Sequence, residues 1–182
     1  MLYRTTLTNG TATATVATIL TGPKSTGDKL VAFADAEDGV NTTCADSYLY
    51  YTNTTTSSIT LGPETTLLDS GATVVVPDYE GPNSAFSAGR QEGMGLLDGI
   101  RAALNYAPAG ISKNATVGGY GYSGGATAIG AYFDLFRHNI GLILDSCRLG
   151  CVTAADLCSR AEHQGLGIWR DTRQFDLYPP EG

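Results

Sequence analysis

The run Gly-Tyr-Ser-Gly-Gly over residues 121–125 constrains the fold of this chain more than any other feature. It follows the short apolar stretch Ala115–Val117 and opens the small-residue segment Ala126–Tyr132, so it predicts a sharp turn from a strand into a helix. A serine in such a turn takes a strained backbone conformation, and its neighbours must be small for the turn to close. The pattern indicates a nucleophile elbow, with Ser123 as the candidate catalytic nucleophile.

The same residues also fit a dinucleotide-binding loop. Gly119, Gly121 and Gly124 have that spacing, and Asp145 ends an apolar run about 20 residues later, where such a fold carries an acidic residue. A dinucleotide loop usually follows the first strand of its domain, whereas at least three predicted strands precede this one. The position favours the elbow, and the dinucleotide loop and an inert glycine-rich turn stay as alternatives.

Strand and helix patterns alternate along the chain. Runs of β-branched and apolar residues bounded by turns predict strands, and apolar residues at helical spacing predict helices. This alternation predicts a mostly parallel sheet flanked by helices, with functional groups beyond the carboxyl ends of the strands, where Asp38, Asp78 and Ser123 lie. The predicted strands are Thr11–Leu20, Lys29–Ala34, Ala72–Val76, Ala115–Val117 and Ile140–Leu144, the predicted helices are Ala88–Tyr106 and Ala126–Arg137, and a Thr/Ser-rich loop is predicted around Asn53–Ser58.

The chain is long enough for one well-buried domain, with 182 residues of which 42% are hydrophobic. After Asp145 the periodicity ends, and cysteines, scattered arginines and a Tyr-Pro-Pro ending follow without a clear strand or helix. We therefore expect a partial α/β core over residues 1–146. Residues 147–182 form an unassigned tail, which we interpret as disordered or non-native.

Charge and cysteine spacing argue against several classes of function. The net charge of −7, from 18 acidic and 11 basic residues without a Lys/Arg-rich block, speaks against a nucleic-acid partner. The cysteines form no paired C-x-x-C arrangement and no histidine stands at a matching zinc-ligand spacing, so neither a metal site nor a cofactor is predicted. The four cysteines are Cys44, Cys147, Cys151 and Cys158.

The signals for cellular location disagree with one another. The start of the chain, Met1–Thr6, lacks the apolar core of a signal peptide, and no stretch approaches the about 20 apolar residues that span a bilayer. Yet the first third is rich in threonine and serine, and the whole chain carries four N-glycosylation sequons. We interpret the chain as a secreted protein whose true N-terminus is absent from this sequence. The sequons begin at Asn9, Asn41, Asn53 and Asn114.

Motifs upstream of the elbow share their order and spacing with a known family. They are Asp78–Gly81, Ala85–Gly89, Glu92–Met94 and Leu97–Ala102, preceded by Leu2–Thr6, Val16–Thr18, Glu37–Asp38, Cys44–Ala45 and Ser47–Tyr48. Together with Gly-Tyr-Ser-Gly-Gly, these motifs resemble the fungal secretory lipases of the lipase A type over roughly residues 2–137. The resemblance implies an α/β-hydrolase fold that is truncated at both ends and lacks its last strands and lid.

The resemblance also implies a function, namely hydrolysis of acylglycerol esters at a lipid–water interface by a secreted triacylglycerol lipase that serves lipid catabolism. The catalytic triad of such a lipase runs serine, acid, histidine along the chain. Ser123 would attack the ester carbonyl, and backbone N–H groups would hold the developing oxyanion. Gly124 supplies one of these donors, and the resemblance places the second at Asp38.

The other members of the triad are harder to find. His163, in Ala161-Glu162-His163, looks like the histidine motif of the family and is the candidate base, although it lies only 40 residues after Ser123. Asp78 and Glu80 precede the serine, whereas the family's acid follows it, so we interpret both as structural. A catalytically inactive lipase-like fragment therefore stays as an alternative, as does a peptidase or an acyltransferase with the same elbow.

Overall fold

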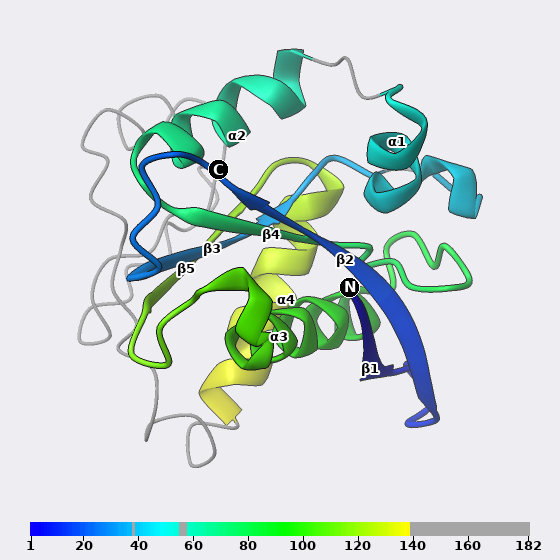
Figure 1. Cartoon of the computed structure of the whole chain (residues 1–182). Coiled ribbons are helices and arrows are strands. Elements are labelled where there is room, and N and C mark those ends of the chain that lie inside the picture. Colours follow the sequence, from blue (N-terminus) through cyan, green and yellow to red (C-terminus); the bar gives the residue numbers. More distant parts are fainter. Residues whose placement is uncertain (38, 55–57, 139–182) are drawn as a thin grey trace, which may run out of the picture.

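The strands of the described residues form one five-stranded sheet, in the order β1-β2-β4-β3-β5 (Figure 1). The computed structural model describes residues 1–37, 39–54 and 58–138. β2 pairs antiparallel with both β1 and β4, whereas β3 pairs parallel with both β4 and β5, so every strand except β2 runs in one direction. The strands are β1 Leu2–Thr6, β2 Ala12–Thr21, β3 Lys29–Ala34, β4 Thr73–Pro77 and β5 Thr116–Gly121.

Helices cover both faces of the sheet. In Figure 1, α3 and α4 lie below the sheet, and α1 and α2 lie above it. No helix within the described residues is long and apolar enough to cross a bilayer. The α-helices are α1 Asp46–Thr52, α2 Ser58–Asp69, α3 Gly89–Asn105 and α4 Gly124–His138, and two short 3-10 turns span Thr42–Cys44 and Ala107–Ala109.

Each face of the sheet has its own hydrophobic core. Successive side chains of a strand point to opposite faces, so the apolar runs of β3 and β4 supply both cores at once. Val74, Val75 and Val76 are all fully buried, as expected for a buried central strand. The core under α3 and α4 includes Leu30, Ala32, Ala34, Val75, Leu96, Leu97, Ile100 and Ile129, and the core under α2 includes Val31, Phe33, Leu67, Val74 and Val76.

The predicted strands and helices that lie within the described residues are confirmed, and the Thr/Ser-rich loop is confirmed only in part. Four of the predicted strands and both predicted helices are present, with ends that differ by a few residues. The Thr/Ser-rich loop is confirmed only around Asn53, because α2 begins at Ser58. β1, α1 and α2 were not predicted. The strand predicted over Ile140–Leu144 and the tail over 147–182 lie outside the described residues.

Replacing Leu96 by alanine tests the core between the sheet and α3. Leu96 is fully buried, so Leu96→Ala is expected to lower the free energy of unfolding by about 2–5 kcal/mol. Leu2→Ala is the matched control, because the Leu2 side chain is 74% exposed and its loss should change the free energy of unfolding by less than about 0.5 kcal/mol. Urea unfolding followed by circular dichroism measures both. Equal losses for the two variants would contradict this description of the core.

Candidate active site

Three parallel strands end at the same edge of the sheet. β4 ends at Pro77, and Ala34 and Gly121 at the ends of β3 and β5 face each other in register. The loops that follow these strands therefore meet beyond this edge, which is where open α/β sheets place their functional groups. The residues that follow β4 include Asp78, and those that follow β5 include Ser123.

Ser123 occupies the sharp turn between β5 and α4. Its backbone φ is +54°, in the left-handed region that non-glycine residues rarely adopt. Two hydrogen bonds close the turn, from the amide of Gly125 to the carbonyl of Tyr122 at 3.0 Å and from the amide of Ala126 to the carbonyl of Ser123 at 3.0 Å. The Ser123 residue is exposed, so the strained turn presents its hydroxyl outside the protein core. This is the strand-turn-helix geometry that a nucleophile elbow requires, and we call this turn, residues 121–126, the elbow.

Two glycines allow the elbow to close. A Cβ on Gly121 would lie 2.6 Å from the carbonyl carbon of Gly125 and 2.8 Å from Cγ1 of Ile129. A Cβ on Gly125 would lie 2.6 Å from the carbonyl oxygen of Asp35 and nearer still to the carbonyl oxygen of Ala34. The first turn of α4 therefore touches the backbone at the end of β3, and no side chain fits between them. The requirement for small neighbours is confirmed in detail.

The loop after β3 lies against the elbow because of this contact. The buried phenol of Tyr79, two residues after the end of β4, holds the backbone of this loop. The Tyr79 hydroxyl donates to the carbonyl of Asp35 at 2.7 Å and accepts from the amide of Glu37 at 3.1 Å. Within the loop, the amide of Glu37 also donates to the carbonyl of Asp35 at 2.9 Å. The backbone of residues 35–37 is thus fixed next to the first turn of α4.

Asp78 has a structural part in this edge of the sheet. Its carboxylate accepts hydrogen bonds from the amide of Ser47 at 2.9 Å and from the Ser47 hydroxyl at 2.5 Å. Ser47 is the second residue of α1, where helix amides lack intrahelical acceptors, so Asp78, the first residue after β4, caps this helix. The contact agrees with the structural role expected for Asp78.

Carboxyl groups are buried in the loop after β3 and at the start of α1. Burial raises the pKa of Glu37 to about 8, and the charges of Glu80 and Asp78 add to the shift. Burial also raises the pKa of Asp46 well above its usual range, with Asp35 as the next contributor. A buried charge without a partner is costly, and an acid in such a site keeps its proton instead. At neutral pH, Glu37 is therefore mostly protonated in the folded chain.

The predicted site residues fall into two groups. Ser123 and Gly124 lie at the elbow, and Gly124 begins α4, where its amide has no acceptor within the helix. Asp38 and His163 lie outside the described residues, so their roles stay predictions. Tyr79 belongs to one of the family motifs, but its sequence context gives no sign of its role, because its partners lie 42 and 44 positions away.

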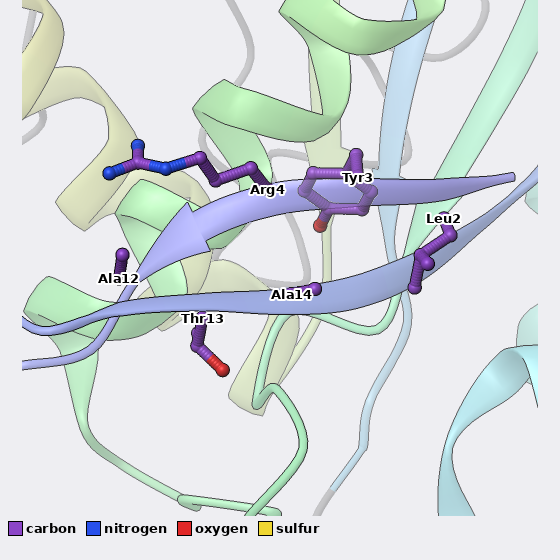
Figure 2. Close-up of a pocket in the computed structure, with 6 residues that line it drawn as sticks. All are labelled: Leu2, Tyr3, Arg4, Ala12, Thr13 and Ala14. Atoms are coloured by element: carbon purple, nitrogen blue, oxygen red, sulfur yellow. The ribbon is translucent and has the colours of Figure 1, made fainter.

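A separate hollow lies on the hairpin of β1 and β2. Figure 2 shows the six residues that line it, none of which belongs to the elbow or to the loop after β3. It is open to solvent and has small, mostly apolar walls, so we do not assign it to the active site. The lining residues are Leu2, Tyr3, Arg4, Ala12, Thr13 and Ala14.

Comparison with known proteins identifies the class of protein that carries this site. The family profile described as "Secretory lipase" matches residues 46–136, which is half of the chain. Two relatives are secreted triacylglycerol lipases, LIP2 of Malassezia furfur at 46% identity and LIP7 of Malassezia globosa at 44% identity, each over 136 residues. Each alignment covers 71% of this chain and 29% of the relative. The chain belongs to the secretory lipase family.

The fold agrees with this assignment. The structure of Candida antarctica lipase A in its closed state superposes with a TM-score of 0.67 and 35% sequence identity, over 75% of this chain and 33% of that protein. The predicted α/β-hydrolase class and the predicted family are therefore confirmed, and the chain spans less than a third of the length of the curated relatives. Because the relatives are named secreted lipases, the predicted extracellular localisation is confirmed as well.

The contact between α4 and β3 predicts opposite effects for two glycines of the same helix. Gly125→Ala forces a Cβ into the backbone of Ala34, so we expect the free energy of unfolding to fall by about 3 kcal/mol or more. Gly130→Ala is the control, because Gly130 is exposed in α4 and its Cβ would meet nothing within 4 Å. It should raise stability by about 0.5–1 kcal/mol. Thermal unfolding compares the two variants, and a Gly125→Ala protein as stable as the parent would contradict the contact.

The buried Glu37 predicts how stability depends on pH. Its pKa is about 8 in the folded chain and about 4.5 when unfolded, so the folded state holds an extra proton between these values. The free energy of unfolding should therefore decrease as pH rises from about 4.5 to about 8. Above that range, Glu37 should contribute little further change.

Glu37→Gln removes the ionisable group and should make the free energy of unfolding depend less steeply on pH in this interval. Asp69→Asn is the control, since the Asp69 side chain is 68% exposed. Urea titrations at several pH values measure the slope for both variants. A slope that is unchanged in Glu37→Gln would show that Glu37 is charged in the folded chain.

Proposed function

We propose that this chain is a serine ester hydrolase that acts on acylglycerols, with Ser123 as its nucleophile. The observation that carries the proposal is the strained and exposed Ser123 at the carboxyl edge of the parallel strands, with φ of +54°. Asn53, Ser84 and Ser87 also have a positive φ. Among the described residues, however, only Ser123 has it in a turn from a strand directly into a helix, which is the place of the elbow in hydrolases. The turn also follows the fifth strand along the chain, which speaks against a dinucleotide-binding loop.

The proposed reaction is acyl transfer in two steps. The Oγ atom of Ser123 attacks the ester carbonyl carbon while the base takes its proton, and a bond forms between Oγ and carbon. The amides of Gly124 and Asp38 hold the negative oxygen of the tetrahedral intermediate. The carbon–oxygen bond of the ester then breaks, and the alcohol leaves with the proton from the base. Water releases the fatty acid by the same steps, and His163 is the proposed base.

The proposed substrate follows from the relatives. The similar proteins of Malassezia are named triacylglycerol lipases. We therefore propose triacylglycerol or another lipid ester at a lipid–water interface as the partner of this chain, in lipid catabolism outside the cell. No nucleic-acid partner, cofactor or metal is part of the proposal.

Labelling with a fluorophosphonate tests the nucleophile. Intact-mass analysis of the purified chain should show a single adduct that disappears in Ser123→Ala and persists in Gly130→Ala. Hydrolysis of a p-nitrophenyl ester, measured in parallel, should fall about 10⁴-fold or more when Ser123 is removed. A folded chain that binds fatty ester without an adduct would be a catalytically inactive member of the family. A chain that binds NAD instead would be a dinucleotide-binding domain.

A further inference from the structure

We propose that Tyr79 is a positioning residue, whose phenol holds the backbone of residues 35–37 in place beside the nucleophile elbow. The catalytic part of this inference rests on the proposed function, because the loop leads directly to Asp38, the proposed second oxyanion donor. The structural part stands on the contacts of Tyr79 itself.

The Tyr79 hydroxyl acts as both donor and acceptor toward the backbone of the loop. Its proton points to the carbonyl of Asp35 at 2.7 Å, and the carbonyl of Glu37 is a second acceptor at 3.2 Å. Its oxygen accepts from the amide of Glu37 at 3.1 Å. Burial, followed by the charge of Glu37, raises the pKa of the phenol above its usual range, so the hydroxyl stays protonated at all ordinary pH values.

The phenol is itself held rigidly. Tyr79 is 1% exposed and belongs to the core between the sheet and α3. A Cβ on Gly95 of α3 would lie 3.1 Å from the Tyr79 carbonyl oxygen and 3.5 Å from its Cα, so this helix packs directly on the Tyr79 backbone. The residues on either side of Tyr79 are held as well. The Gln91 side chain donates to the carbonyl of Glu80, the residue after Tyr79, at 2.9 Å. The amide of Asp78, the residue before Tyr79, donates to the carbonyl of Val16 in β2 at 2.9 Å.

The loop after β3 is therefore held between the first turn of α4 and the Tyr79 phenol. On one side it touches the first turn of α4, through the close approach of Gly125 to the carbonyls of Ala34 and Asp35. On the other side it bonds to the Tyr79 phenol. Donors stabilise an oxyanion well only when they are fixed before the charge develops. The bonds of Tyr79 to Asp35 and Glu37, which we call the tether, hold the backbone that precedes the proposed donor in the sequence.

A pair of conservative variants tests the tether. Tyr79→Phe removes one buried hydroxyl from the loop. Tyr3→Phe is the matched control, since Tyr3 is also buried and its hydroxyl donates to the carbonyl of Gly95 at 2.8 Å, on α3 and away from the loop. Both variants should lower Tm by a similar amount, about 2–4 °C. Stability alone does not separate them, so two other measurements decide.

The first measurement is amide hydrogen exchange at Glu37, which needs no activity. Tyr79→Phe should speed exchange at this amide by about tenfold, and Tyr3→Phe should leave it unchanged. The second is ester hydrolysis, in which Tyr79→Phe should lower kcat by about 10- to 100-fold with little change in KM. Tyr3→Phe should keep the kcat of the parent chain.

Each result separates the two halves of the inference. Unchanged exchange in Tyr79→Phe overturns the tether, and faster exchange with an unchanged kcat overturns the positioning role. A parent chain that neither hydrolyses esters nor takes a fluorophosphonate adduct removes the proposed function and the positioning role with it, while exchange still decides the tether. If Tyr79→Phe does not fold, rapid exchange at Glu37 in the parent chain overturns the tether and protection of that amide supports it.

Discussion

The approach of α4 to the end of β3 is the contact on which the rest of the site depends. A helix backbone lies against a strand backbone at Gly125 and Ala34, at a distance that leaves no room for a Cβ. This contact fixes where α4 begins, and thereby the sharp turn that gives Ser123 its positive φ. It also brings the loop after β3 next to the elbow, although the two segments are far apart in the sequence. Packing of backbone on backbone thus sets the geometry that the proposed chemistry needs.

Polar side chains directly after β4 bond to the loop after β3 and to α1 at this edge of the sheet. Tyr79 bonds to the loop after β3, and Asp78 caps α1 through Ser47. Both residues follow the same fully buried strand, so side chains next to this strand hold two separate segments. Exposed loops that carry function are commonly held by a rigid scaffold in this way. Here two consecutive side chains provide the support.

How far the sequence predicts this structure depends on whether the information is local. β3, β4 and α3 were predictable because their apolar periodicity matches the elements they form, and the sharp turn from β5 into α4 was predictable because small residues surround Ser123. α1 and α2 were not, since threonine and serine favour strands and loops and only packing on the sheet makes these segments helical.

Contacts between distant residues leave no such trace. The bonds of Tyr79 join residues more than 40 positions apart, and nothing in Asp78-Tyr79-Glu80 indicates their partners. The buried carboxyl group of Glu37 is equally invisible in the sequence, where it resembles a solvated acid. Its burial couples folding to the binding of protons. Glu37 is charged in the unfolded chain at neutral pH, whereas in the folded chain its pKa of about 8 keeps most of it protonated. Folding therefore takes up protons, so its measured heat includes the ionisation enthalpy of the buffer that supplies them.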